Sequence, residues 1–239
     1  MKFRLLLFSL NLLSMSILAQ SPYKLSGPQE AAWLGGSGAG IGLSVGLHYR
    51  HQPFTPEQVA ALDPGRVPAF DRYALRHYSS FARKSSDVAL FSTLAIPALL
   101  LLDPDIRPDA GTVGVLLGEA FLVNTALTLT AKELVRRPRP FTYNPGVPLT
   151  DKLDRDARLS FFSGHTSTAA AMTFATAAIW SEYHPGSDWK PLVWTSAVLV
   201  PATVGYLRMR AGKHFLSDVA AGFVVGAATG WLVPYLHRR

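Results

Sequence analysis

Six apolar segments alternate with short polar connections along this chain, and that alternation limits the folds it can adopt. The last segment is apolar all round rather than on one face, which is the pattern of a helix surrounded by lipid or protein. Hydrophobic residues make up 49% of the chain and charged residues only 16%, and signals for strands are weak. The sequence therefore predicts an all-α fold, a six-helix bundle embedded in a membrane. The candidate helices are Ala31–Leu47, Val88–Leu102, Thr112–Ala131, Thr166–Trp180, Leu192–Leu207 and Phe215–Leu236.

Glycines recur at four-residue spacing in two of these segments. The last segment carries Gly222, Gly226 and Gly230, and the first repeats the spacing at positions 38, 42 and 46. In lipid, small residues at this spacing let two helix backbones approach each other closely. Only the third and last segments reach the ~20 apolar residues that a helix needs to span a bilayer. Close helix packing is expected at both glycine rows.

The first 19 residues have the composition of a secretory signal peptide. Lys2 and Arg4 form a basic start, an apolar stretch follows, and Ala19 is a small residue at the expected cleavage point. The alternative is a short uncleaved anchor. Residues 20–239 then form one domain, because no composition shift, low-complexity tract or internal repeat divides them.

Charge and cysteine content exclude several classes of protein. The net charge is +7, but the basic residues cluster in a few connections and form neither a basic helical stripe nor a known nucleic-acid module. We therefore expect no nucleic-acid partner. Cysteine is absent, which rules out disulfides and cysteine nucleophiles.

Three short stretches carry the residues of a phosphate-binding site. They are Lys132 to Pro140, Ser163 to His165, and Arg208 to Asp218. A phosphoryl group in transfer carries negative charge on its equatorial oxygens, so catalysis consists mainly of positioning it and neutralising that charge. Lysine and arginine supply the positive charge, and histidine has a pKa suited to attack and proton transfer.

Each stretch has a local reason to bind an anion. Pro138 and Pro140 end the third helix, which lets Lys132 and Arg139 converge on one group. Ser163-Gly164-His165 opens the fourth helix, where free backbone N–H groups and a serine hydroxyl favour phosphate. The adjacent Arg136 and Arg137 are interpreted as anchors at the membrane interface.

The third stretch supplies a nucleophile and its partners. His214 and Asp218 are four residues apart and are expected on one face at the start of the last helix. A carboxylate there can accept the Nδ1 proton and leave Nε2 free to attack. Arg208 is expected to hold phosphate through two parallel hydrogen bonds.

The order and spacing of these stretches, K-x6-RP, SGH and R-x5-H-x3-D, resemble the type 2 phosphatidic acid phosphatase superfamily, which includes class A acid phosphatases and vanadium haloperoxidases. The resemblance covers roughly residues 80 to 236. Phe162 and Leu207 depart from the pattern, which usually has proline and serine there. The resemblance implies a nucleophilic His214 oriented by Asp218, and His165 as the acid and base. It also implies that the phosphate-binding groups are Lys132, Arg139, Ser163, Gly164 and Arg208.

The implied activity is hydrolysis of a lipid phosphate through a phosphohistidine, without a metal or other cofactor. Substrates of the family include phosphatidic acid, phosphatidylglycerol phosphate, polyprenyl diphosphates and lipid A phosphates, and the sequence does not choose among them. One alternative is a soluble secreted acid phosphatase of broad specificity. Another, less favoured because the chain is short, is a vanadium haloperoxidase.

The expected location is the membrane of a bacterial cell envelope, with conflicting indications of orientation. Basic residues gather on the side of the motifs, which favours a cytoplasmic site by the positive-inside rule. The family usually places this site on the periplasmic face, and we take that as the expectation. Glu119 is an ionisable group inside an apolar segment, so it is either functional or bonded between helices. No set of residues has the sequence spacing of metal ligands.

Overall fold

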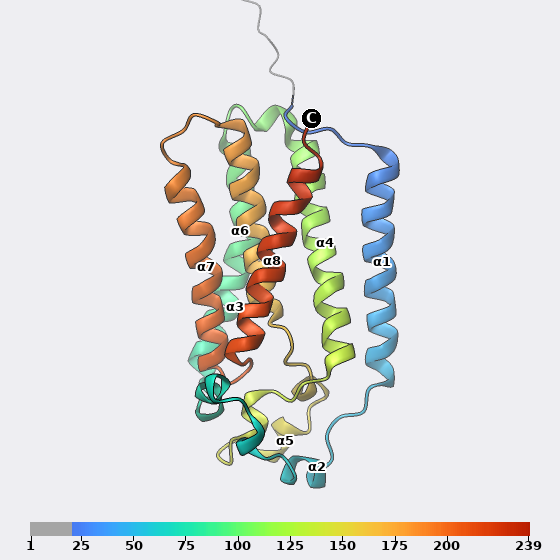
Figure 1. Ribbon diagram of the computed structural model, residues 1–239, viewed down its shortest axis with the longest axis vertical. Coiled ribbons are helices and arrows are strands. Elements are labelled where there is room, and N and C mark those ends of the chain that lie inside the picture. The colour runs from blue at the N-terminus through green and yellow to red at the C-terminus, as the bar shows by residue number, and fades with distance from the viewer. Residues whose placement is uncertain (1–20) are drawn as a thin grey trace, which may run out of the picture.

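The computed structural model describes residues 21–239, and in these residues it is an all-helical bundle (Figure 1). The signal-peptide prediction for residues 1–19 lies outside the described residues. The long helices are α1 (Gly27–Arg50), α3 (Ser80–Ala95), α4 (Ala110–Val135), α6 (Gly164–Tyr183), α7 (Lys190–Arg210) and α8 (Leu216–Leu236). The only β pairing in this part of the chain is an isolated bridge between Tyr23 and Arg238. The predicted all-α bundle is confirmed.

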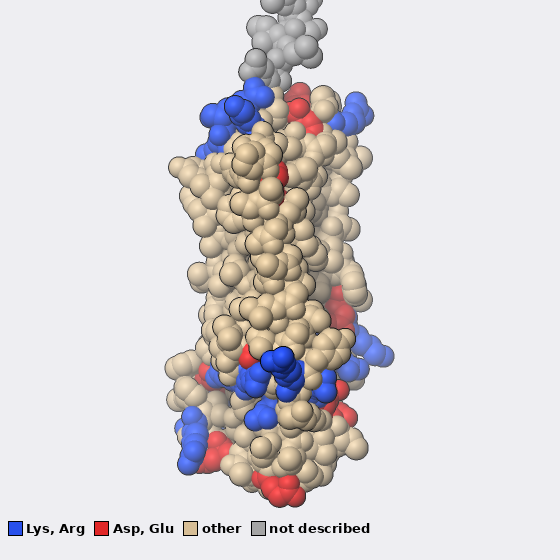
Figure 2. Space-filling view, turned by 90° about the vertical axis from the view of Figure 1, so that its right-hand side faces the viewer, with Lys and Arg blue, Asp and Glu red and all other residues tan. Residues whose placement is uncertain are grey.

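Six long helices in the described part of the chain correspond to the six predicted segments, although α3 ends at Ala95 and a 3₁₀ helix, Ile96–Leu102, completes the second segment. Within residues 21–239, four segments have the length and hydropathy to cross a bilayer, namely Ser80–Leu102, Arg107–Tyr143, Lys190–Arg210 and Leu216–Leu236. Figure 2 shows a largely uncharged band between two ends where charged side chains gather. This distribution is what a multi-pass membrane protein requires, because charge in the hydrocarbon layer is costly.

Helices α6 and α8 form the centre of the bundle. Their contact is the most extensive between any two helices of the described chain, and Figure 1 places both between α4 and α7. Glycine makes this packing possible, since a Cβ added at Gly226 would lie 2.1 Å from the Ser167 carbonyl oxygen. Gly222 and Gly230 meet the α6 backbone in the same way. The close approach predicted for this glycine row is confirmed.

The glycine row of α1 behaves differently, and the prediction of close packing there was wrong. A Cβ added at Gly38, Gly42 or Gly46 would meet nothing within 4 Å. Helix α1 lies at the edge of the bundle beside α4 (Figure 1), and it turns another face inward. On that face Gly40 approaches Ala126 and the Ser44 hydroxyl lies 3.0 Å from that of Thr130. The spacing of the row is therefore not sufficient to identify a contact face.

Two connections cover one end of the bundle and form the floor of the site. One follows α1 and contains the short helix α2 (Pro56–Ala60), and the other follows α4 and contains α5 (Leu149–Lys152). Phe54 from the first packs with Phe141 and Ala157 from the second. Burial of these apolar side chains holds the floor in place at one end of α4, α6 and α8.

Candidate active site

The three predicted stretches converge on one cavity of about 690 Å³ at the covered end of the bundle. Helices α1 and α4, the start of α6, the end of α7 and the connection after α4 surround it. Two of the predicted residues, Ser163 and Asp218, are buried but do not line the cavity. The predicted residues that do line it are Lys132, Arg139, Gly164, His165, Arg208 and His214.

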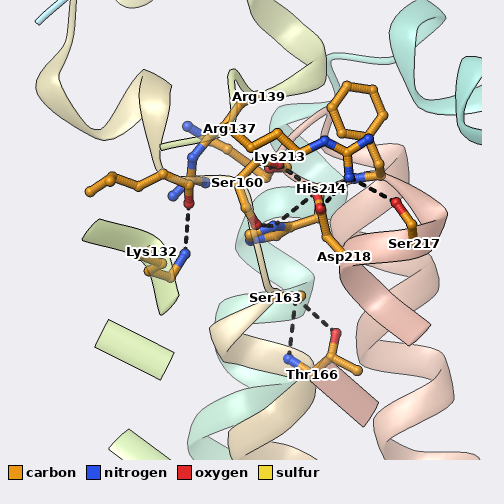
Figure 3. Close-up of polar contacts among 12 residues, drawn as sticks. Lys132, Arg137, Arg139, Ser160, Ser163, Thr166, Lys213, His214, Ser217 and Asp218 are labelled. Carbon is orange, nitrogen blue, oxygen red and sulfur yellow. Dashed lines mark hydrogen bonds and ion pairs between the residues drawn. The ribbon is translucent and has the colours of Figure 1, made fainter. Parts of the chain in front are cut away.

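The imidazole of His214 is buried, and only one of its two nitrogens has a hydrogen-bond partner among residues 21–239. Its Nδ1 donates a hydrogen bond to the Ser160 carbonyl oxygen at 2.7 Å (Figure 3). Because a carbonyl only accepts, the proton of the neutral ring is on Nδ1 and Nε2 carries a lone pair. Burial, and then the charges of Arg139 and Lys132, hold the pKa of His214 well below its ordinary value. The ring is therefore neutral and nucleophilic at neutral pH.

The structure corrects the expected bond between His214 and Asp218. The Asp218 Oδ2 atom lies 3.9 Å from His214 Nδ1, and accepts instead from the Ser160 hydroxyl at 2.5 Å and from the Phe215 amide at 2.9 Å. The reason is that α8 begins only at Leu216, so His214 precedes the helix and does not share a helical face with Asp218. Asp218 fixes Ser160, and the Ser160 carbonyl fixes the imidazole.

Arg137 is the second correction, because it is part of the site's support rather than an interfacial anchor. Its Nη1 atom donates to Asp218 Oδ1 at 2.5 Å, and its Nη2 atom donates to Asp71 Oδ2 at 2.8 Å. The guanidinium also lies 4.1 Å from the centre of the Phe215 ring. A planar guanidinium with five donors suits such a bridge between two buried carboxylates. Arg137 thus holds in place the Asp218 carboxylate, which accepts the hydrogen bond from Ser160.

Arg139 and Arg208 are buried cations that retain free donors. Arg139 donates to the Asp156 carboxylate at 2.6 Å, while its Nη1 has no hydrogen-bond partner among the residues described. Arg208 donates to the Ser86 hydroxyl at 3.1 Å, and its Nε is likewise unpaired within the described chain. Although burial raises the pKa of Asp156, the charges of Arg139 and Lys132 hold it below its ordinary value. An anion in the cavity would satisfy the open donors.

Lys132 and Gly164 bring α4 and α6 together at the cavity. The Lys132 ammonium donates to the Leu159 carbonyl at 2.7 Å, which leaves two of its three protons for other acceptors. A Cβ added at Gly164 would lie 3.1 Å from a methyl group of Thr128 and 3.7 Å from Lys132 Cε. Glycine at this position therefore lets the first turn of α6 lie close to Thr128 of α4.

Ser163 does not have the position that was expected of a phosphate donor. Its hydroxyl caps α6, accepting from the Thr166 amide at 3.4 Å and lying 2.9 Å from the Thr166 hydroxyl (Figure 3). Its backbone amide donates to the Asp218 carbonyl at 3.0 Å. Ser163 thus joins the start of α6 to the start of α8.

His165 has a carboxylate partner that lies outside the three motifs. Its Nε2 donates to Asp87 Oδ1 at 2.8 Å, and the same oxygen lies 3.3 Å from an Arg208 nitrogen. Asp87 is on α3, 78 residues before His165. No local pattern distinguishes it, so the sequence did not indicate it. The contact holds His165 at the cavity wall and links it to Arg208.

The cavity also has an apolar wall that the sequence did not predict. Helix α1 contributes Val45 and Tyr49, and Leu129 and Leu159 lie among the other lining residues. A polar pair interrupts this wall, where His48 Nδ1 donates to Glu133 Oε1 at 2.7 Å. The same cavity therefore offers cations at its floor and hydrocarbon along one side.

The fold and the site together define a helical membrane protein whose cavity holds a buried histidine among three cations, an arrangement suited to a phosphoryl group. A model of the PAP2 superfamily matches residues 113–239. The chain belongs to the PAP2 superfamily.

Two comparisons, one of sequence and one of structure, find a phosphatase of Bacillus subtilis. Phosphatidylglycerophosphatase B of strain 168 is 31% identical over 127 residues, which is 53% of this chain and 59% of that protein. The matched region thus spans about six tenths of that relative's length. A crystal structure described as the first transmembrane PAP2 type phosphatidylglycerolphosphate phosphatase has a TM-score of 0.50 and 22% identity, and the match covers 84% of this chain and 94% of that one. At 22% identity, this structural similarity shows a shared fold.

Proposed function

We propose that this protein is a metal-independent lipid phosphate phosphatase. The observation that carries the proposal is a single cavity in which Lys132, Arg139 and Arg208 surround a bare His214 nitrogen beside the apolar wall of α1. The cations match the phosphate and the wall matches an acyl chain. A small soluble ester would have no use for the apolar wall.

The chemistry proceeds in two steps. His214 Nε2 attacks phosphorus and the bond from phosphorus to the lipid oxygen breaks. His165, whose Nε2 is bonded to Asp87, takes up a second proton on Nδ1 when the phosphate anion binds beside it, and donates that proton to the lipid oxygen. The product of this step is a phosphohistidine and a free lipid alcohol. His165 then takes a proton from water as the water oxygen attacks phosphorus, which releases inorganic phosphate and restores His214. The three cations stabilise the charge of both transition states.

For the substrate we propose a glycerophospholipid that carries a terminal phosphomonoester, such as phosphatidylglycerol phosphate. The name of the Bacillus subtilis relative supports this choice. The cavity supports it as well, because the Glu133 carboxylate at its wall can accept hydrogen bonds from glycerol hydroxyls. The same carboxylate repels a second phosphate, so polyprenyl diphosphates are expected to be poorer substrates.

The purified enzyme is expected to release phosphate in EDTA and to be inhibited by vanadate. The side-chain cations stabilise the negative charge that Mg²⁺ stabilises in other phosphoryl transfers, so no metal is needed. Vanadate adopts the five-coordinate geometry of the transition state and is therefore expected to bind tightly. The measurement is initial phosphate release in detergent from phosphatidylglycerol phosphate, phosphatidic acid, undecaprenyl diphosphate and p-nitrophenyl phosphate. Activity that disappears on chelation and returns with Mg²⁺ would contradict the proposed chemistry. A preference for the soluble ester would contradict the proposed substrate.

We also propose that the active site faces the periplasm. The chain enters α8 beside the site and ends at the opposite end of the bundle (Figure 1), so a reporter after Arg239 indicates the other face. A C-terminal green fluorescent protein is expected to fluoresce, because it folds in the cytoplasm. A C-terminal alkaline phosphatase is expected to be inactive, and strong activity from it would reverse the proposed orientation.

A further inference from the structure

Three residues with side chains that can bind a metal ion meet at the end of the bundle away from the active site. Glu30 lies in the first turn of α1, Glu119 lies inside α4, and His237 follows α8. Figure 1 shows the corresponding ends of these helices together at the end where the C-terminus lies. One ligand atom from each residue lies within 4.8 Å of the others. Because the three come from distant parts of the sequence, no spacing pattern could reveal the group.

The two carboxylates are buried and without hydrogen-bond partners. Glu119 is 1% exposed and the Glu30 side chain 14%. None of their four oxygens has a hydrogen-bond partner among residues 21–239. A buried ionised carboxylate is costly unless a cation or a donor compensates it. The neighbouring Arg238 is directed elsewhere, since it pairs with Glu182 at 2.6 Å.

The histidine presents a lone pair to these carboxylates. His237 Nδ1 donates to the Val233 carbonyl at 2.7 Å, so in the neutral ring Nε2 carries no proton. A backbone carbonyl on the far nitrogen is the usual support of a metal-bound histidine, because it fixes the tautomer and the ring. The Gln29 amide nitrogen donates a hydrogen bond to Nε2 at 3.2 Å, so an ion bound at this nitrogen would replace that bond.

The distances from His237 to the two carboxylates match those between ligands around one ion. His237 Nε2 lies 3.3 Å from Glu119 Oε2 and 3.4 Å from Glu30 Oε1. Ligands about 2.0–2.2 Å from a tetrahedral zinc ion are roughly 3.3–3.6 Å apart. We propose that Glu30, Glu119 and His237 bind a divalent first-row transition-metal ion, with zinc the preferred occupant. One imidazole nitrogen among oxygen ligands favours such an ion over Mg²⁺ or Ca²⁺.

A second group at the same end, Asp103, Asp105 and His184, is a weaker candidate and a useful control. Its histidine already donates to Asp103 Oδ2 at 2.7 Å, and the Asp105 side chain is 72% exposed. An ordinary hydrogen bond therefore accounts for this pair without an ion. This second group is a useful control because it contains the same kinds of metal ligand, carboxylates and a histidine, in a more exposed position.

The ion would fasten α1 to the rest of the bundle. Helix α1 packs mainly on α4, and a Cβ added at six of its glycines would meet nothing within 4 Å. Coordination by Glu30 would tie its first turn to α4 and to the end of α8. The other end of α1 forms the apolar wall of the catalytic cavity. The site is thus structural and separate from the proposed phosphoryl transfer, which uses no metal.

The test is metal binding by the full-length protein in detergent, stripped with EDTA and dialysed. Isothermal titration with Zn²⁺ is expected to show one tight site in the wild type and in the control variant His184→Gln. Glu119→Gln, which keeps the size of the side chain, is expected to weaken that site at least tenfold. Zn²⁺ is expected to raise the melting temperature of the wild type and of the control but not of Glu119→Gln. Mg²⁺ is expected to give no such shift.

Cobalt provides a readout that does not depend on a variant folding. Co²⁺ added to the stripped wild type is expected to give the intense visible bands of four-coordinate cobalt, and Zn²⁺ is expected to remove them. Absence of a tight site and of these bands in folded wild-type protein would overturn the proposal. So would equal Zn²⁺ affinity in the wild type and a folded Glu119→Gln variant. Loss of the site in His184→Gln would assign it to the surface group instead.

Discussion

Replacement of His214 by alanine is expected to lower kcat by roughly 10⁴-fold or more, the scale on which loss of a nucleophile is measured in other enzymes. No other described side chain combines a bare nitrogen with burial among three cations, and the cations themselves stabilise charge without forming a bond to phosphorus. Because the pKa of His214 is held far below its ordinary value, loss of activity on mild acidification is not expected to come from this ring.

Phosphoenzyme trapping distinguishes loss of the nucleophile from loss of the fold. Wild-type protein quenched during turnover of a ³²P-labelled substrate is expected to carry acid-labile label, and His214→Ala is expected to carry none. The partly exposed His77, which donates to the Tyr73 carbonyl, provides a matched His→Ala control with near-normal labelling. Labelling or substantial turnover in His214→Ala would mean that another residue attacks phosphorus.

Replacement of Gly226 by alanine is expected to prevent normal packing of α6 against α8. The added methyl carbon would lie 2.1 Å from the Ser167 carbonyl oxygen, and a helix backbone cannot yield as a flexible side chain does. The helices must separate, at a cost on the order of 4 kcal/mol or more. The measurement is the yield of monodisperse protein in detergent and its melting temperature.

Gly42→Ala is the matched control, since the same substitution there meets nothing within 4 Å. Alanine has the higher helix propensity, so this variant is expected to be as stable as the wild type or slightly more so. Equal stability of the two variants would show that α6 and α8 are not in backbone contact. Because α6 carries His165 and α8 carries Asp218, Gly226→Ala is also expected to lose activity.

The sequence predicted the helices and the cavity residues because both are encoded locally. Apolar segments indicate helices by composition, and the three motifs each hold their residues within a dozen positions. Arg137 and Asp87 were not predicted because their partners are distant in the sequence. The partners of Arg137 lie 66 and 81 residues away. The partner of Asp87 is on another helix, 78 residues along the chain. A basic residue next to a membrane helix has the same local sequence pattern whether it anchors the helix at the membrane interface or supports an active site.

The His214–Asp218 error has a different physical origin. A spacing of four places two side chains together only inside a helix, and the chain turns into α8 after His214. The glycine rows show the same limit, because both have the spacing of close packing and only that of α8 faces another helix. Such distinctions depend on where a helix begins and how it is rotated, which are tertiary properties.

The amide of Ser163 bonded to the Asp218 carbonyl has a consequence for how such an enzyme could be re-engineered. Helices α6 and α8 are joined at their first turns and packed along the glycines of α8. His165, the proposed acid and base, and His214, the proposed nucleophile, therefore belong to one rigid unit. Helix α1 shares the cavity with that unit but little of its packing. Grafting a different α1, or varying Val45 and Tyr49 on it, should therefore exchange one lipid preference for another while the reacting groups keep their geometry.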